Sequence, residues 1–484
     1  MYRRKFLLLS SGAIATTALS QCAIAPQAQQ PTVNPPLDSP EIYRSQAGEL
    51  SLDLVAQRQT VQLGDRRAKL LTYNGQVPGP RLEVRPGDRL QIHFTNQLDQ
   101  PTNLHYHGLH ISPEGTADNV FLQIQPGEHY TYDFEIPPNH PAGTFWYHPH
   151  VHGHVAEQLF GGLAGLIIVR GELDEIPEIQ AAQEEFLILK DYALDAQGNI
   201  PAPGHLAQMT GRMGDRLTAN GQMNPQITLK QGGLLRLRLL NASVSRFFRL
   251  SLEEHSLFLI ATDGGSIAEP IELDTLDLAP GQRAEVLVKG VQQSGQYRLL
   301  NTPFNPAQGM MGRGMEMGMG RMHHGGSGST RMETVATVAY SGSRSPLSLP
   351  EQLLSVDPLP DPQVTREFTL NHWPGMVFLI NGQAFKAGRV DTTVQLDTTE
   401  DWLITNTGMM THPFHVHINK FQVISRNGQP VPYRAWEDVV SIQPGEQVRL
   451  RMQFKDFPGK TVYHCHVLDH EDRGMMGILE IQSV

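Results

Sequence analysis

Apolar and polar residues alternate along many short stretches of the chain, and turns rich in glycine, proline and asparagine separate these stretches. Residues 89–94 and 234–239 are examples in which every second side chain, or nearly so, is apolar. Because successive side chains of a strand point to opposite faces, this period of two predicts β-strands. Few stretches have the period of a helix. The pattern therefore predicts an all-β protein made of sandwiches or barrels.

Two short motifs recur three times and divide the chain. Asn-Gly-Gln begins at residues 74, 220 and 381, and Pro-Gly follows in each unit at residues 126, 280 and 444. Repeats spaced this far apart are whole domains rather than solenoid units. We predict domains at residues 44–172, 183–342 and 363–484, joined by linkers rich in proline, glutamate and aspartate.

The N-terminal residues 1–30 are predicted to be an export signal. Arg3 and Arg4 precede an apolar stretch shorter than a membrane span, and small residues follow to about residue 25. The paired arginines resemble a twin-arginine signal, and an ordinary export signal is the alternative. Either signal predicts a periplasmic or otherwise extracytoplasmic protein. The residues before Cys22 loosely resemble a lipoprotein cleavage site, so a lipid anchor at Cys22 is a further hypothesis.

Composition and charge narrow the function classes. Hydrophobic residues make up 39% of the 484 residues, which provides material for packed cores. A net charge of -11 argues against a nucleic-acid-binding protein, which would have a basic face. The only long apolar stretch lies at the N-terminus, so we expect no membrane span in the mature chain. Cys22 and Cys465 are the only cysteines, and the mature chain therefore has no predicted intramolecular disulfide.

Histidines provide the strongest evidence for chemistry. Ten of the 21 histidines fall into four clusters, two near each end of the chain. Residues i and i+2 of a strand share a face, so each His-x-His pair can direct two imidazoles to one site. The ten histidines are His105, His107, His148, His150, His412, His415, His417, His464, His466 and His470. Of the others, His110, His152 and His154 are interpreted as supporting or structural residues and His372 as an ordinary one.

The stretch His464-Cys465-His466 predicts that one strand joins two metal sites. Its histidines face one way and its thiolate faces the other. Cys465, His412 and His470 supply one thiolate and two nitrogens, with Met475 as a weak axial ligand, and this set is typical of a blue-copper electron-transfer site. The remaining eight histidines suit a copper cluster. Structural zinc would not combine so many imidazoles with one thiolate.

With these four motifs the chain resembles a three-domain multicopper oxidase of the bacterial laccase and copper efflux oxidase type. The resemblance covers essentially the whole mature chain and implies three cupredoxin-like Greek-key β-sandwich domains and four copper ions. It implies a type 1 copper at His412, Cys465, His470 and Met475, and a type 2 copper at His105 and His415. It also implies a type 3 pair, with one ion at His107, His148 and His466 and the other at His150, His417 and His464.

The implied reaction is the one-electron oxidation of four substrate equivalents, coupled to the reduction of dioxygen to two waters. We expect dioxygen and small reductants as partners, and a monomer. Oxygen reduction consumes protons, and Asp118 and Glu471 match acids that the copper efflux oxidases use for proton delivery. The alternative is that each is a solvated surface acid.

The reductant has two interpretations. Residues 309–324 contain six methionines, and thioethers suit Cu(I). With Met409 and Met410 they favour Cu(I) as substrate and a role in copper homeostasis. However, this loop lies in the second domain instead of the third, and Gly408 replaces an acidic residue of the efflux enzymes. A broad phenol laccase is the competing hypothesis. The six loop methionines are Met310, Met311, Met315, Met317, Met319 and Met322.

Two other classes remain. The chain could be a copper-binding or scaffold protein without turnover, because some relatives of this fold are cell-division scaffolds. Those relatives lack the ligand histidines, whereas all ten histidines and Cys465 are present here. A copper nitrite reductase would be expected to have two domains. Both classes are therefore disfavoured.

Overall fold

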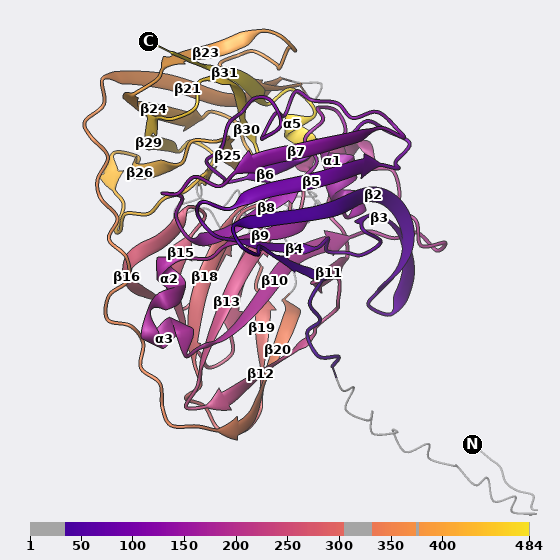
Figure 1. Ribbon diagram of the computed structural model, residues 1–484, viewed down its shortest axis with the longest axis vertical. Helices are drawn as coiled ribbons and strands as arrows, with labels where there is room; N and C mark the ends of the chain where they lie inside the picture. Colours follow the sequence, from indigo (N-terminus) through magenta and orange to yellow (C-terminus); the bar gives the residue numbers. More distant parts are fainter. Residues whose placement is uncertain (1–33, 304–331, 374–376, 484) are drawn as a thin grey trace, which may run out of the picture. The chain divides into compact units, whose positions relative to one another are not determined.

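The computed structural model describes residues 34–303, 332–373 and 377–483. The predicted export signal with Cys22 and the methionine-rich stretch 309–324 lie outside the described residues. By its internal contacts, Pro35–Val484 is a unit of its own. Six β-sheets dominate this unit (Figure 1), which confirms the predicted all-β class.

The first sandwich consists of two sheets whose inward side chains share one apolar core that includes Leu52, Ile92 and Phe145. In β5 (Arg89–Asn96) every second side chain is buried, as the alternation predicts. In hydrogen-bonded order, one sheet contains β1 (Ile42–Arg44), β4 (Arg81–Val84), β9 (Gly165–Val169), β8 (Gly143–His148) and β6 (His105–His107). The other contains β3 (Arg66–Tyr73), β2 (Glu49–Leu63), β5 and β7 (His129–Glu135).

The second sandwich has the same plan, with Leu187, Leu237 and Leu250 in its core. One sheet contains β11 (Arg216–Ala219), β10 (Gln183–Tyr192), β13 (Leu234–Asn241), β18 (Arg283–Lys289), β15 (Leu257–Thr262) and β16 (Gly265–Leu273). The other contains β12 (Gln226–Gln231), β20 (Glu333–Ser343), β19 (Gln296–Asn301), β14 (Phe248–Leu252) and β17 (Leu276–Leu278).

The third sandwich packs around Trp402, Phe414 and Leu450. One sheet contains β22 (Val377–Ile380), β21 (Val364–Trp373), β24 (Thr398–Asn406), β29 (Gln447–Phe454), β26 (Phe421–Arg426) and β27 (Gln429–Pro430). The other contains β23 (Val390–Gln395), β31 (Met476–Gln482), β30 (Gly459–Cys465), β25 (His412–Val416) and β28 (Val439–Ile442).

One strand topology is repeated in all three sandwiches. In each, the first long strand pairs in parallel with a later strand: β2 with β5, β10 with β13, and β21 with β24. The Asn-Gly pairs at residues 74, 220 and 381 form the same two-residue turn, with positive φ at both positions. Asparagine and glycine are the residues that best adopt this geometry. The recurring motif therefore marks the equivalent turn of each sandwich.

Strand β13 differs from the simple alternating pattern because both of its faces are buried. Its two arginines, Arg236 and Arg238, each lie 2.6 Å from a carboxylate oxygen of Glu285. Arg238 also contacts Asp174, whose helix lies over this face. Buried charges are tolerated when they are paired and hydrogen-bonded. The polar face of the strand is therefore covered by a network of ion pairs.

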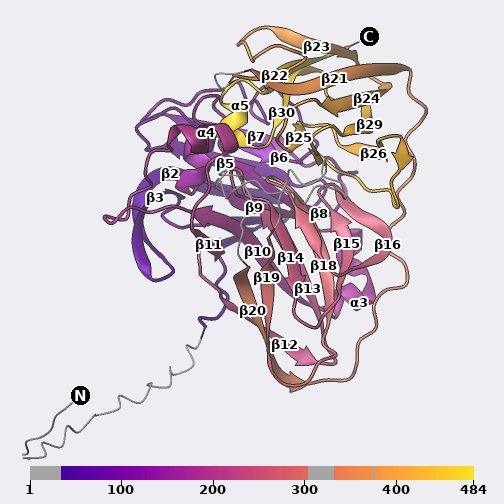
Figure 2. The same cartoon turned by 180° about the vertical axis from the view of Figure 1, so that it is seen from behind.

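Within the described residues the helices are short and lie between strands. Figure 2 shows α4 beside α5, and the two helices are in contact. No helix in the described part of the chain is both long and apolar enough to cross a membrane. The helices are α1 (Val155–Gly161), α2 (Glu172–Glu175), α3 (Pro177–Gln180), α4 (His205–Thr210) and α5 (Leu468–Glu471).

Candidate metal centres

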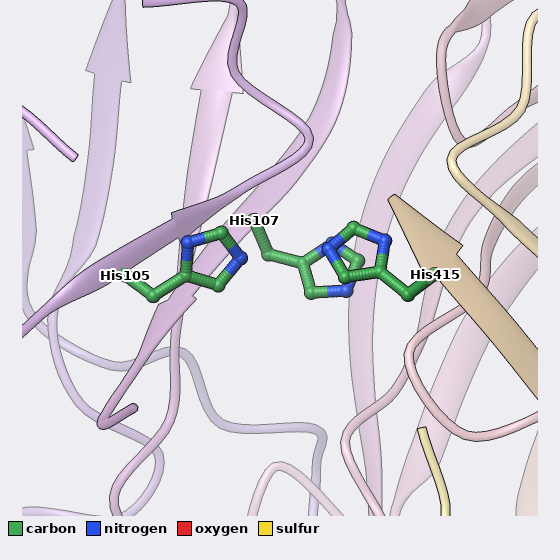
Figure 3. A group of neighbouring side chains, drawn as sticks. All are labelled: His105, His107 and His415. Carbon is green, nitrogen blue, oxygen red and sulfur yellow. The ribbon is translucent and has the colours of Figure 1, made fainter. Parts of the chain in front are cut away.

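Strands of the first and third sandwiches bring eight of the ten clustered histidines together. β6 pairs with β8 so that His105 lies opposite His148, and β25 pairs with β30 so that His415 lies opposite His464. In Figure 3 the rings of His105 and His107 on β6 lie beside that of His415 on β25. All eight side chains are buried. Two strand pairs from domains far apart in sequence thus form one internal histidine cluster.

The eight histidines form three groups, two of which share His107, and within each group the ligand atoms lie within 4.8 Å of one another. Nε2 of His464 is 3.0 Å from Nε2 of His417 and 3.2 Å from Nε2 of His150. Convergence of several imidazole nitrogens on a small volume is the arrangement that binds a transition metal. The groups are His107, His148 and His466; His150, His417 and His464; and His105, His107 and His415.

Several of these rings are oriented by hydrogen bonds from Nδ1. His105 donates to Asp118 over 2.9 Å, and His415 donates to the backbone oxygen of Asp438 over 2.7 Å. His464 donates to its neighbour's carbonyl over 3.0 Å. Because carboxylates and carbonyls only accept hydrogen bonds, the proton is on Nδ1 and the Nε2 lone pair faces the cluster.

Buried nitrogens without a partner show that these residues fit a metal. Nε2 has no hydrogen-bond partner, within the described part of the chain, in His105, His107, His148, His415 and His466. Buried polar atoms are nearly always satisfied, so such a concentration needs an explanation. Burial also lowers the pKa of the His107, His148, His415 and His466 imidazoles, and it lowers that of His464 to about 3. Neutral imidazoles are the form that binds copper.

A second, smaller group contains sulfur. Sγ of Cys465 lies 3.4 Å from Nδ1 of His412 and 3.8 Å from Nδ1 of His470, and all three residues are buried. The backbone N–H of Val467 points to the same sulfur over 3.4 Å. Burial raises the pKa of the thiol well above its usual value, so the thiolate needs a cation beside it. Met475 is fully buried in the same apolar core.

Helix α4 of the second sandwich covers the sulfur-bearing group. Nε2 of His470 donates to the backbone oxygen of Met209 over 3.0 Å, and His470 is only 1% exposed. Arg473 donates to Gln208 in the same helix. A reductant therefore has no direct access to the His470 ring in this conformation.

The two predicted proton-delivery acids are both buried, so neither is a surface acid. Asp118 accepts hydrogen bonds from His105 and from the backbone of Tyr106 over 2.9 Å. Glu471 lies 3.4 Å from Nδ1 of His464 and 3.8 Å from Nε2 of His150, and neither of its oxygens has a hydrogen-bond partner among the described residues. Burial raises the pKa of Glu471 well above its usual value.

Comparison with known proteins identifies the family. Residues 55–174, 186–321 and 357–483 each match a family described as multicopper oxidase. Multicopper oxidase mco of Staphylococcus haemolyticus is 31% identical over 422 residues, which cover 85% of this chain and 84% of that protein. The chain belongs to the multicopper oxidase family. The family resemblance predicted from the histidine motifs is thereby confirmed.

Two further relatives span almost the whole of this multicopper oxidase. A multicopper oxidase from Campylobacter jejuni, described as a metallo-oxidase, superposes with a TM-score of 0.81 at 30% identity, covering 93% of this chain and 96% of that one. Cell division protein FtsP of Proteus mirabilis is 28% identical over 99% of this chain and 98% of its own. The chain is a dioxygen-reducing, copper-binding oxidoreductase of cupredoxin fold.

The remaining predicted residues of this multicopper oxidase are placed as follows. Met409 is 75% exposed, and Met410 is partly buried against the core of the third sandwich. Asp118, Glu471 and all ten clustered histidines lie in or beside the two groups described above. The six methionines of residues 309–324 lie outside the described residues.

The sequence assigned no role to three residues that lie near the two metal-binding groups. A Cβ atom at Gly408 would lie 3.4 Å from Nδ1 of His372, a buried nitrogen without a hydrogen-bond partner in the described residues. His372, which no sequence pattern singled out, thus lies beside Gly408. Arg283 and Asp438 contact the histidine cluster directly. Single charged residues are common in strands and turns, and no pattern distinguishes these from the others.

Proposed function

We propose that this oxidase binds about four copper ions per chain, with the ligand sets that its motifs predict. His412, Cys465, His470 and Met475 would hold the type 1 copper, and His105 and His415 would hold the type 2 copper. His107, His148 and His466 would hold one type 3 ion, and His150, His417 and His464 would hold the other. Bound copper supplies one-electron redox chemistry that couples oxidation of a reductant to reduction of dioxygen to water.

One observation carries this proposal: three consecutive residues are divided between the sulfur-bearing group and the histidine cluster. Cys465 lies in the sulfur-bearing group, while its neighbours His464 and His466 lie in two of the three histidine groups. His464 and Cys465 end β30 and face opposite ways, and the ring centroid of His466, directly after the strand, lies 5.7 Å from that of His464. The backbone of residues 464–466 is therefore a short covalent connection between the centre that accepts electrons and the centre that uses them.

Two acids support the dioxygen half of the reaction in different ways. Glu471 is buried, free of hydrogen bonds within the described residues and next to His150 and His464, so it can hold a proton and release it toward the cluster. Asp118 is hydrogen-bonded to His105 and orients that ring. We propose Glu471 as the proton donor and Asp118 as a residue that positions His105.

An apolar cavity supports dioxygen entry. The cavity has a volume of about 460 Å³ and is lined by His150 together with residues of the first and third sandwiches. Val120, Val462 and Met476 form much of its apolar wall, and Phe121 at the same site is 42% exposed. Dioxygen is small and apolar, so such a cavity provides a route from the surface to a cluster ligand.

We propose Cu(I) as the physiological reductant. Met409 and Met410 shortly precede the type 1 ligand His412 in the sequence, and Nδ1 of His372, which is within electrostatic range of His412, has no partner among the described residues. Thioethers and imidazoles are soft or borderline donors that suit Cu(I). The cover over His470 favours an ion over a bulky aromatic molecule. A phenol laccase without a role in copper homeostasis is the second candidate, and it requires α4 to move aside.

The proposed function is tested by oxygen uptake with the copper-loaded protein. Rates with Cu(I) and with a phenol are compared, and water must be the product. Efficient uptake with Cu(I) supports a cuprous oxidase, while efficient uptake with the phenol alone supports a laccase. A copper-loaded protein that consumes no oxygen with either reductant would instead be a storage or scaffold protein.

We also propose export by the twin-arginine route. The test is to replace both arginines (Arg3→Lys and Arg4→Lys) and to locate the protein by cell fractionation.

A further inference from the structure

The second sandwich supplies none of the ten clustered histidines, yet one of its side chains reaches their cluster. Arg283, the first residue of β18, is fully buried. Its guanidinium donates to the backbone oxygens of Thr144, Gly281 and Asp263 over 3.0 Å each. These bonds tie it to the first and second sandwiches.

The same guanidinium also binds Asp438 of the third sandwich. Nη1 and Nη2 of Arg283 donate to the two carboxylate oxygens over 2.7 and 2.6 Å, and Asp438 is buried. A bidentate arginine–carboxylate pair has a fixed planar geometry. The packing around the pair is tight, because a Cβ atom at Gly108 would lie 2.3 Å from Nη2.

Asp438 in turn contacts two histidines of the cluster. Its backbone oxygen accepts the Nδ1 proton of His415 over 2.7 Å, and its Oδ1 lies 3.5 Å from Nδ1 of His107. The two rings stack with centroids 3.9 Å apart and planes 13° apart. One residue therefore faces the Nδ1 atoms of both rings.

The pair also faces Nδ1 of His107. Nη1 of Arg283 shares its two hydrogens among Gly281, Asp438 and Nδ1 of His107, which lies 3.2 Å away. If Nε2 of His107 holds a metal, the neutral ring carries its proton on Nδ1, and Oδ1 of Asp438, 3.5 Å away, is the carboxylate oxygen that faces it. The lone pair of His107 is then on Nε2, which has no partner in the described residues.

We propose that Arg283 and Asp438 are a positioning pair for His107 and His415. The pair sets the tautomer and the spacing of two rings that face copper, so the second sandwich controls how firmly the cluster holds metal. This proposal rests on the proposed function, because it assigns these two rings to the type 2 and type 3 copper ions.

The test compares three variants of the full-length, copper-loaded protein. Arg283→Lys removes the bidentate geometry and Asp438→Asn removes the carboxylate charge. Arg236→Lys is the matched control, since Arg236 is also a buried arginine of the second sandwich paired with a carboxylate, Glu285. Copper content, the blue absorption band and the type 2 electron paramagnetic resonance signal are measured for each, together with the unfolding midpoint of the metal-free protein.

We expect Arg283→Lys and Asp438→Asn to bind the type 2 copper about 10–100-fold more weakly and to alter its resonance signal, with the blue band per chain unchanged. Arg236→Lys should keep both signals, whatever its unfolding midpoint. The inference is overturned if Arg283→Lys and Asp438→Asn lose stability only, with full copper and an unchanged type 2 signal. If the wild-type protein itself has no type 2 signal, the proposed function fails, and this inference fails with it.

If the variants do not fold, a measurement on the wild-type protein still tests the proposal. Nitrogen-15 spectra of the metal-free protein report the tautomer of each histidine, and His107→Gln identifies the resonance of His107. We expect the proton of His107 on Nδ1. A proton on Nε2 would mean that Arg283 donates to Nδ1, and it would overturn the proposal.

Discussion

The sulfur-bearing centre and the eight-histidine cluster are assembled in different ways. His412, Cys465, His470 and Met475 all belong to the third sandwich and lie within 64 residues of one another in sequence. The cluster takes half of its histidines from the first sandwich and half from the third, and Arg283 of the second sandwich contacts it. All ligands of the first centre come from one domain, although α4 of the second sandwich covers it, whereas the second centre depends on how three domains pack together.

This difference matters for function. A centre within one domain can keep its geometry when domain contacts loosen, and its electron-accepting role requires only that a reductant comes near. The cluster must hold its histidines within one small volume, so any loosening between sandwiches changes it directly. We therefore expect that single substitutions can impair one centre and leave the other intact.

Of all the substitutions, Cys465→Ser should produce the largest difference between the two centres. Loss of the only thiolate in the described residues removes the blue band and abolishes oxygen uptake, because the type 1 copper loses its strongest ligand. The histidines of the cluster are unchanged, so about three copper ions should remain. Absorption spectroscopy and elemental analysis check both points. Loss of all copper would show that the two centres are not independently assembled.

Glu471→Gln should impair dioxygen reduction at the histidine cluster and leave the sulfur-bearing centre intact. Amide replacement keeps the shape of the side chain but removes its proton, and oxygen uptake should fall by about 10²-fold. Reduction of the blue band by Cu(I) in the absence of oxygen should keep its wild-type rate. Rapid-mixing spectroscopy distinguishes the two steps. Equal slowing of both steps would contradict the assignment of Glu471 to the dioxygen half.

Changes at the reductant side should have smaller, selective effects. Deletion of residues 309–324 should lower Cu(I) oxidation severalfold and leave phenol oxidation unchanged, and His372→Gln should shift the ratio in the same direction. Oxygen uptake with each reductant gives this ratio. If deletion leaves the ratio unchanged, the methionine-rich stretch has no part in recruiting Cu(I).

The smallest effect is expected at the mouth of the apolar cavity. Ala387 lines this cavity and is exposed, so Ala387→Phe should narrow the entrance at little cost in stability. The KM for dioxygen should rise a fewfold, while the KM for Cu(I) stays the same. Steady-state rates at varied oxygen concentration test this. An unchanged KM for dioxygen would mean that oxygen enters elsewhere.

The structural features that depend on local spacing could be predicted from the sequence. Alternation predicted β5, and the Asn-Gly turns recur at equivalent positions because the same backbone geometry is needed three times. The three-sandwich class was also predicted. Strand geometry also predicted the division of residues 464–466 between the sulfur-bearing group and the histidine cluster, although β30 ends at Cys465. These features need no knowledge of tertiary contacts.

The features that depend on packing between domains were not predictable in this way. Arg236 alternates with leucines like a surface residue, yet it is buried because Glu285 lies on the neighbouring strand. The cover of His470 by α4 and the contacts of Arg283 with Asp438 join residues more than 150 positions apart. Neither composition nor periodicity reports such pairs.

The central claim is that one chain contains two distinct copper centres, one with sulfur and one with imidazoles only. Copper content together with the visible and electron paramagnetic resonance spectra of the copper-loaded wild-type protein tests it most directly. The account predicts about four copper ions per chain, an intense thiolate-to-copper band and a separate type 2 signal. Fewer ions without the blue band, or a blue band without a type 2 signal, would contradict it.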